Sequence, residues 1–127
     1  MSSMRPVRIL LVEDNDVFRV ALELLLGMRG DVEVVASVGD GAAAVSAAIK
    51  HQPDVVLMDY RLPGMNRIEA TTEVLAAMPD VAVVALTASA DAAEREALVA
   101  AGAVTCLTKD QELDEIVAAI RHAAAVA

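Results

Sequence analysis

The residues best suited to chemistry are polar residues that follow short apolar runs. Glu13 and Asp14 come after the first run, Asp59 after the third, Thr87 after the fourth and Lys109 after the fifth. Three carboxylates brought together would repel one another and raise at least one pKa unless a cation is bound. A hard divalent cation removes that conflict, and Mg²⁺ suits it best because it binds carboxylates, water and phosphate oxygens.

Each of these residues alone has an ordinary structural interpretation. An aspartate after a strand usually belongs to a turn or caps a helix, and a single threonine or lysine indicates little. Together they are suited to phosphoryl transfer, because a carboxylate can attack phosphorus and form an acyl phosphate. A metal, Lys109 and Thr87 could then contact the three equatorial oxygens. Asp59 lies between the acid pair and the Thr87/Lys109 pair in strand order, so it is the predicted nucleophile.

The elements that must position these residues follow from the alternation of two kinds of apolar segment. Short runs rich in β-branched residues predict strands buried on both faces, at 7–12, 32–38, 55–58, 81–86 and 104–107. Longer stretches with helical periodicity lie between and after them, at 16–28, 41–51, 68–78, 92–101 and 111–125. The first helix has an apolar stripe made of Val17, Ala21, Leu24, Leu25 and Met28.

Local signals support the helix boundaries. Asp91 and Asp110 are predicted N-caps, Gly102 stands where a C′ glycine is expected, and Pro79 closes the third helix. Five strand–helix units predict an α/β fold with a five-stranded parallel doubly wound sheet of order 2-1-3-4-5, as in flavodoxin and CheY. The carboxyl ends of its strands would bring the polar residues to one edge.

Composition narrows the classes of function. The chain has 127 residues, which suits one domain, and a formal charge of −9 that would repel DNA. Phe18 and Tyr60 are its only aromatic residues, so base stacking is not a plausible mode of binding. Cys106 is the only cysteine, and no uncharged apolar stretch is long enough to span a bilayer. We therefore expect a soluble cytoplasmic domain with no membrane partner.

Three enzyme classes fit less well. A dinucleotide-dependent oxidoreductase needs a glycine-rich turn after the first strand, where this chain has Glu13-Asp14-Asn15-Asp16. A P-loop nucleotide hydrolase needs G-x-x-x-x-G-K-[ST], which is absent from the sequence. A metal-dependent aspartyl phosphatase would usually have an acid two residues after its nucleophile, and that position is Arg61.

Four segments resemble the response-regulator receiver domains of two-component signalling, most closely those of the NarL/FixJ type. They are LLVEDN at 10–15, VVLMDYRLPGMNRIEA at 55–70, VALTAS at 84–89 and GAVTCLTKD at 102–110. The resemblance implies that a histidine kinase phosphorylates Asp59, so that the chain is a signalling phosphoacceptor and not an enzyme. It also implies that residues 1–127 form one receiver domain, whose DNA-binding output domain lies outside this chain. Homodimerisation is a further expectation.

The resemblance also assigns roles to the site residues. Asp14, Asp59 and the backbone carbonyl of Arg61 would hold Mg²⁺, and Glu13 would act through metal-bound water. Lys109 would pair with the phosphoryl group. Thr87 would move inward to donate a hydrogen bond to it, which would reshape the surface of the fourth helix, the fifth strand and the fifth helix.

Two positions depart from the family pattern. Cys106 stands where the family usually has an aromatic residue that moves together with the threonine, so the usual rotamer change of a ring is not expected here. Arg67 stands where glycine is usual, and a left-handed backbone there would cost about 1 kcal/mol or more. These departures leave a second interpretation open, in which the chain is a degenerate receiver that binds partners without being phosphorylated.

Overall fold

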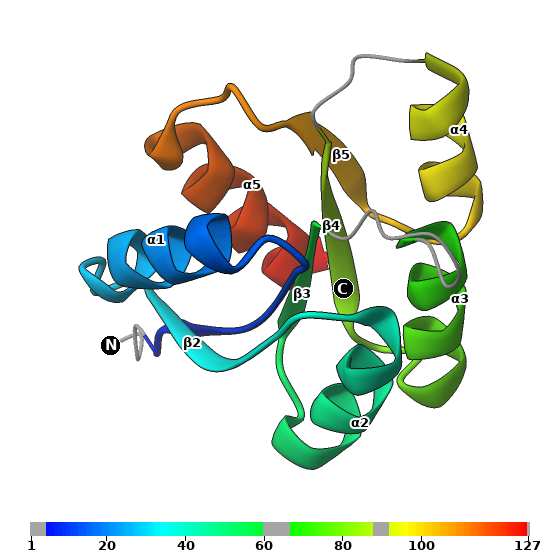
Figure 1. The fold of residues 1–127 in the computed structure, drawn as a ribbon, viewed down its shortest axis with the longest axis horizontal. Coiled ribbons are helices and arrows are strands. Elements are labelled where there is room, and N and C mark those ends of the chain that lie inside the picture. Colours follow the sequence, from blue (N-terminus) through cyan, green and yellow to red (C-terminus); the bar gives the residue numbers. More distant parts are fainter. Residues whose placement is uncertain (1–4, 60–66, 88–91, 127) are drawn as a thin grey trace.

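A computed structural model of the chain describes residues 5–59, 67–87 and 92–126, and the structural statements below concern these residues. Five strands alternate with five helices along the chain (Figure 1). They are β1 (Val7–Glu13), α1 (Asp16–Gly27), β2 (Val32–Val38), α2 (Gly41–His51), β3 (Val55–Asp59), α3 (Arg67–Ala77), β4 (Ala82–Thr87), α4 (Ala92–Ala100), β5 (Thr105–Thr108) and α5 (Leu113–Val126). No described helix is both long enough and apolar enough to cross a membrane.

The five strands form one parallel sheet in the order β2-β1-β3-β4-β5. This order confirms the predicted doubly wound topology. β3 is the central strand; the winding runs from β1 to β2 on one side and from β3 through β4 to β5 on the other. All five strands end at the same edge of the sheet, so the residues at their carboxyl ends are brought together.

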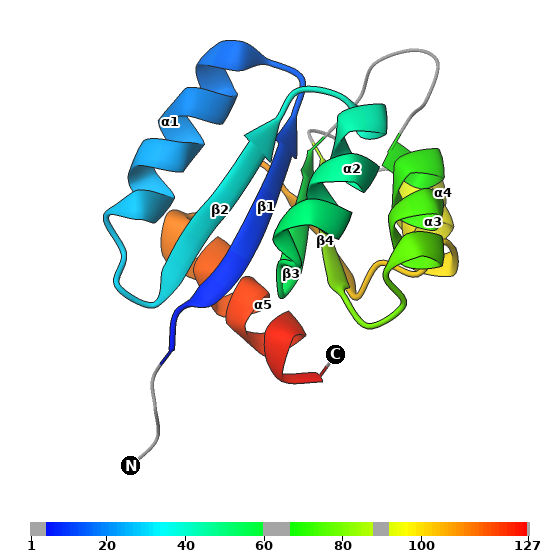
Figure 2. The ribbon, with the colours of Figure 1, turned by 90° about the horizontal axis from the view of Figure 1, so that it is seen from below.

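Helices cover both faces of the sheet, with α1 and α5 on one side and α2, α3 and α4 on the other (Figure 2). β1 shows why an unbroken apolar run is needed in such a sheet. Leu10 and Val12 belong to the core beneath α2, α3 and α4, whereas Ile9 and Leu11 belong to the core beneath α1 and α5. Because successive side chains of a strand point to opposite faces, both sets must be apolar.

The predicted end of the fourth helix is confirmed. Gly102 follows α4 with a φ of +116°, and its N–H donates to the carbonyl of Val99 at 2.9 Å. Ala103 N–H donates to the carbonyl of Leu98 at 3.0 Å, which completes a glycine-terminated cap. The positive φ favours glycine at position 102, and a Cβ atom there would lie 2.4 Å from Leu75 Cδ1, so the Leu75 side chain would also have to move. Pro79 lies two residues beyond the end of α3.

The prediction that Asp110 caps the fifth helix is wrong. α5 begins at Leu113, and the carbonyl of Glu112 accepts from the N–H groups of Glu115 and Ile116. Glu112 N–H in turn donates to the Glu115 carboxylate at 3.1 Å, a reciprocal arrangement that a short-range cap signal did not reveal. The Asp110 carboxylate accepts a hydrogen bond from the Thr108 hydroxyl instead. The other predicted cap, Asp91, lies outside the described residues.

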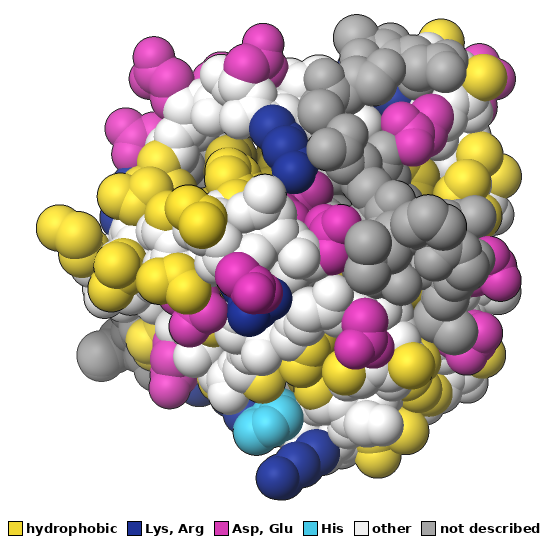
Figure 3. All heavy atoms as spheres, viewed as in Figure 1, with side chains coloured by type: hydrophobic (Ala, Val, Ile, Leu, Met, Phe, Trp, Pro, Cys, Tyr) yellow, Lys and Arg dark blue, Asp and Glu magenta, His cyan; other side chains and the backbone are white. Residues whose placement is uncertain are grey.

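The apolar stripe predicted along the first helix faces away from the sheet. Leu22 and Leu26 are the buried residues of α1, while Val17 is 81% exposed and Met28 is 82% exposed. The helix has apolar residues on more than one of its sides, so periodicity alone did not decide which side packs against the sheet. The exposed stripe is visible as a patch of hydrophobic side chains over α1 in Figure 3.

The backbone at Arg67 is helical, because Arg67 is the first residue of α3. The left-handed conformation that would have carried a cost at this position therefore does not occur. Residues 60–66 lie outside the described residues, and they include the predicted site residue Arg61 and the aromatic Tyr60.

Candidate functional site

The ends of four strands bring the predicted site residues to one edge of the sheet. Glu13, Asp59 and Thr87 are the last residues of β1, β3 and β4, and Lys109 directly follows β5. Glu13 is paired with Asp59 in the β1–β3 register. Lys109 N–H donates to the carbonyl of Thr87 at 2.7 Å, which fixes the backbone of Lys109 beside the end of β4.

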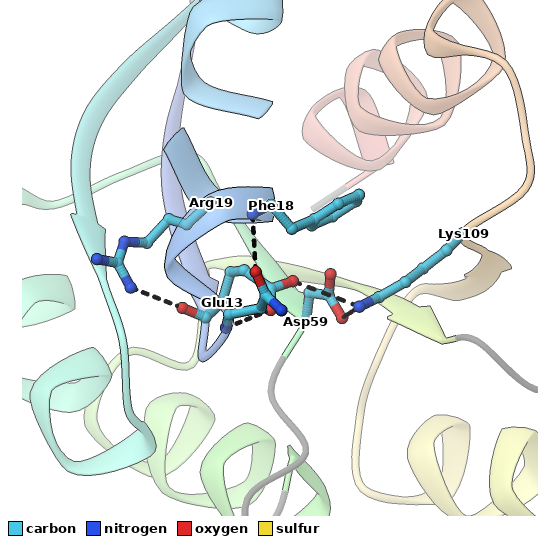
Figure 4. Close-up of polar contacts among 6 residues, drawn as sticks. Glu13, Phe18, Arg19, Asp59 and Lys109 are labelled. Carbon is cyan, nitrogen blue, oxygen red and sulfur yellow. Dashed lines mark hydrogen bonds and ion pairs between the residues drawn. The ribbon is translucent and has the colours of Figure 1, made fainter. Parts of the chain in front are cut away.

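A lysine ammonium lies between two buried carboxylates at the centre of the site (Figure 4). Lys109 Nζ is 2.9 Å from Asp59 Oδ1 and 3.5 Å from Glu13 Oε1. Glu13 and Asp59 are fully buried, whereas the Lys109 side chain is 21% exposed. With both carboxyl groups ionised, two negative charges would face one positive charge in a region that excludes water, and the cluster would carry an excess of negative charge.

Burial and the neighbouring carboxylates perturb the pKa of Glu13. The pKa of Glu13 is raised from 4.5 to about 8, chiefly by burial of its side chain and also by the neighbouring Asp59 carboxylate, through its charge and as an acceptor for a proton on Glu13. A hydrogen bond from Asn15 N–H to Glu13 Oε2, 2.8 Å long, acts in the opposite direction. Asp14 also contributes to the rise through its side chain. The expected rise of at least one pKa occurs at Glu13, with burial as its largest cause and the neighbouring carboxylates as further causes.

The Asp59 carboxylate is poorly satisfied in the absence of further ligands. Neither of its oxygens has a hydrogen-bond partner among the described residues, although both are buried. The close approach of Lys109 is an ion pair that lacks the geometry of a hydrogen bond, and Glu13 can donate to Asp59 only when it carries a proton. Buried carboxylate oxygens normally accept hydrogen bonds, so Asp59 has unused capacity to bind a cation or a donor.

The first turn of α1 supports this cluster through Asn15, Phe18 and Arg19. The Asn15 side chain caps α1 by accepting from Phe18 N–H at 2.9 Å, and the Phe18 ring centroid lies 4.7 Å from Lys109 Nζ. An ammonium at that distance from a ring is held by a cation–π interaction. Phe18 is half-buried, and in this position it supports Lys109 within the site.

Arg19 contacts the backbone that carries the acid pair. Its guanidinium donates to the carbonyl of Glu13 at 3.0 Å (Figure 4). It also forms an ion pair with Asp16 at 2.9 Å. Sequence reasoning did not find Asn15 or Arg19. Asn15 could have been found as the polar residue directly before the first helix, but the Arg19 contact depends on how that helix approaches β1.

The Thr87 hydroxyl lies in a different environment from the acids. The Thr87 side chain is 1% exposed, and its hydroxyl donates to Glu94 Oε1 of α4 at 3.2 Å. Cys106 is buried in the same core that contains Leu98 and Ala103, as expected of a compact apolar residue.

The donor set fits a hydrated Mg²⁺ more closely than a preformed metal cage. No three acidic, histidine or cysteine side chains in the described ranges are arranged as a ready metal site. Mg²⁺, however, usually binds through only one or two carboxylates and retains several waters. The buried, unsatisfied carboxylate of Asp59 and the raised pKa of Glu13 are both features that a bound cation would relieve. Asp14, the adjacent acid, is half-buried.

Comparison with known proteins gives consistent results. Residues 9–121 match the family described as the response regulator receiver domain. The transcriptional regulatory protein LiaR of Bacillus subtilis (strain 168) is 35% identical over 117 residues, which cover 92% of this chain and 56% of LiaR. The response regulator GacA of Pseudomonas viridiflava is 36% identical over 115 residues, which cover 91% of this chain and 54% of GacA. The chain thus spans about half the length of these curated relatives.

Solved structures resemble the whole chain. The signal receiver domain of NarL from Mycobacterium tuberculosis superposes with a TM-score of 0.88 at 33% identity, covering 95% of this chain and 98% of that domain. The receiver domain of the sensor histidine kinase PA1611 from Pseudomonas aeruginosa PAO1 has a TM-score of 0.83 at 34% identity, covering 94% of this chain and 98% of that one. In that structure a magnesium ion is coordinated in the active-site cleft.

Proposed function

Because this chain belongs to the response regulator receiver domain family of two-component signalling, we propose that it is a phosphorylation switch whose acceptor is Asp59. One observation carries this proposal. The Asp59 carboxylate is buried at the carboxyl edge of the sheet, 2.9 Å from the Lys109 ammonium, and its oxygens have no hydrogen-bond partner among the described residues. A nucleophilic carboxylate needs such an environment, with a cation beside it and an oxygen free to form a bond.

In the proposed reaction an oxygen of Asp59 forms a bond to the phosphorus atom, and the bond from phosphorus to a histidine of a partner kinase breaks. The products are an acyl phosphate on Asp59 and a free imidazole on the kinase. Lys109 is placed to pair with an oxygen of the transferred group, because its ammonium already lies beside Asp59 Oδ1. Phosphoryl transfer depends mainly on such positioning and charge neutralisation.

Asp14, Asp59 and the backbone carbonyl of Arg61 would hold Mg²⁺, with Glu13 acting through metal-bound water. When bound there, Mg²⁺ would neutralise the carboxylates and the incoming phosphoryl oxygens. Burial at the ends of β1 and β3 keeps Glu13 and Asp59 in fixed positions for this role. The magnesium ion in the cleft of the receiver domain of PA1611 supports this assignment. Arg61 lies outside the described residues, so its part in the ligand set rests on the family alone.

We further propose that this receiver controls transcription through a DNA-binding domain, since LiaR is a transcriptional regulator and is longer than the matched region. The chain itself has a formal charge of −9, which does not suit direct contact with DNA. A histidine kinase is the proposed upstream partner, and a cytoplasmic location and homodimerisation stay predictions. The chain is proposed to act as a signalling protein and not as an enzyme.

The proposal is tested by intact-mass spectrometry after incubation with acetyl phosphate and Mg²⁺. We expect the wild-type chain to gain one phosphoryl group only when Mg²⁺ is present, and Asp59→Asn to gain none. Asp80→Asn is a matched control, because it removes one carboxylate from an exposed position after α3 and should leave the gain intact. No gain by the wild-type chain, together with no binding of beryllofluoride, would support the degenerate receiver that binds partners without phosphorylation.

A further inference from the structure

The hydroxyl of Thr87 is engaged with α4 and not with Asp59. Thr87 ends β4, and its buried hydroxyl donates to Glu94 Oε1 at 3.2 Å. Glu94 lies in the first turn of α4. Neither oxygen of Asp59 accepts a hydrogen bond from any described residue, so the Thr87 proton is not shared with the acceptor. The hydrogen bond therefore joins the end of β4, at the edge of the sheet that carries the site, to α4, one of the three helices that cover that face of the sheet.

A threonine hydroxyl has one proton to donate. If Thr87 is to donate to an oxygen of a phosphoryl group on Asp59, its hydrogen bond to Glu94 must break. Because the hydroxyl proton can go to only one of these two acceptors, we propose that Glu94 holds Thr87 away from the site in the unphosphorylated protein and releases it on phosphorylation. We call Glu94 a latch in this sense. The inference rests on the proposed function and adds to it a specific residue that couples the site to α4.

Such a coupling is of interest in this chain because Cys106 stands where the family usually has an aromatic residue that moves together with the threonine. Cys106 lies on β5, opposite Ala85 of β4, and is buried in the core that also contains Leu98 of α4. A small thiol has no ring whose position could follow that of Thr87. The Thr87–Glu94 hydrogen bond offers a direct polar route instead, because it connects the strand end to α4 without an aromatic intermediate.

The direction of the effect follows from linkage. Occupation of the phosphoryl position and the Thr87–Glu94 hydrogen bond oppose each other, so removing Glu94 should strengthen binding at the phosphoryl position. A hydrogen bond to a charged acceptor contributes more than one between neutral groups, and it contributes less where one partner is partly exposed, as Glu94 is. We expect the dissociation constant of beryllofluoride to fall by roughly three- to tenfold, with tenfold corresponding to about 1.4 kcal/mol.

The experiment measures beryllofluoride affinity in the presence of Mg²⁺ by calorimetric titration. It compares the wild-type chain with Glu94→Ala and with Glu96→Ala, an exposed acid two residues further along α4 that also removes one negative charge. We expect tighter binding by Glu94→Ala only. A parallel readout without ligand is the amide spectrum of α4, which should shift in Glu94→Ala toward the positions of the beryllofluoride-bound wild-type protein.

The decisive comparison is made in a chain that carries Thr87→Val, because valine keeps the shape of threonine and lacks the hydroxyl. Glu94→Ala should not increase affinity in a chain that already carries Thr87→Val. A gain that persists there, or an equal gain in Glu96→Ala, would show a general effect of charge and would overturn the latch, as would unchanged affinity in Glu94→Ala. Failure of the wild-type chain to bind beryllofluoride at all would instead overturn the proposed function, on which the latch depends.

Discussion

Glu13, Asp59 and Lys109 form a buried cluster with two carboxylates and one ammonium. The ammonium is nearer to Asp59 than to Glu13, at 2.9 Å against 3.5 Å. Lys109 therefore compensates Asp59 more strongly than Glu13. Burial, together with the neighbouring Asp59 carboxylate, raises the pKa of Glu13 to about 8. At neutral pH the cluster lowers its charge by holding a proton on Glu13, and a bound cation would make that proton unnecessary.

The raised pKa of Glu13 predicts how the stability of the metal-free protein depends on pH. The folded protein binds the Glu13 proton more tightly than the unfolded chain, whose Glu13 has the ordinary pKa of 4.5. This contribution to stability is fully present below pH 4.5, falls as pH rises and is lost above about pH 8. Within that window the loss approaches about 1.4 kcal/mol per pH unit.

Urea unfolding between pH 5 and 8.5 in the presence of EDTA measures this slope. Glu13→Gln should show a smaller slope and a higher free energy of unfolding than the wild type at pH 8. Glu33→Gln, which alters an exposed residue of β2, should retain the wild-type slope. Equal slopes for the wild type and Glu13→Gln would contradict the assignment of the proton to Glu13.

At the scale of elements, α1 has two separate tasks. Its first turn supports the site, since Phe18 contacts the Lys109 ammonium and Arg19 donates to the Glu13 carbonyl. Further along α1, the buried residues Leu22 and Leu26 pack the helix against the sheet. The opposite side of α1 carries exposed apolar side chains, which Figure 3 shows as a continuous patch and which contribute little to the core.

This division of α1 predicts opposite outcomes for two leucines that lie two residues apart. Leu26→Ala should lower the free energy of unfolding by about 2–5 kcal/mol, because it opens a cavity in the core beneath α1 and α5. Leu24→Ala should change it by less than about 0.5 kcal/mol, because Leu24 is 66% exposed. Chemical denaturation of both variants measures the difference, and similar losses would show that the packed side of α1 is wrongly assigned.

In the molecule as a whole, the chain carries a net charge of −9. Among the described acidic residues, a strongly raised pKa is found at Glu13, at the carboxyl edge of the sheet. Ordinary salt screens the overall repulsion, whereas a divalent cation bound at that edge would also relieve the local one. Specific binding and general screening can therefore be separated by comparing ions at equal ionic strength.

Mg²⁺ should stabilise the folded chain by mass action. We expect the thermal midpoint to rise with Mg²⁺ concentration, by an amount equivalent to about 2.7 kcal/mol at a hundred times the dissociation constant. KCl at matched ionic strength should produce a smaller rise, and EDTA should reverse the effect of Mg²⁺. Asp14→Asn should lose most of the Mg²⁺-specific rise and Asp80→Asn should keep it. Identical effects of Mg²⁺ and KCl on the wild type would argue against a metal site at this edge.

The alternation of strands and helices, the order of the strands in the sheet and the edge at which the polar residues meet could all be predicted from the sequence. These features depend on local patterns, because a strand buried on both faces needs an unbroken apolar run and parallel crossovers have one hand. Glu13, Asp59, Thr87 and Lys109 each stand directly beside such a run, so their convergence followed from topology alone.

Three features became visible in the folded structure alone: the buried side of α1, the contact of Arg19 with the Glu13 carbonyl, and the hydrogen bond from Thr87 to Glu94. Each of these contacts depends on the rotation and approach of a helix after a loop, which local periodicity does not specify. α1 illustrates the reason most clearly. α1 has apolar residues on more than one side, and any of these sides could have packed against the sheet. The buried side is set by contacts with β1, which precedes α1 by a turn, and with α5, which is distant in the sequence.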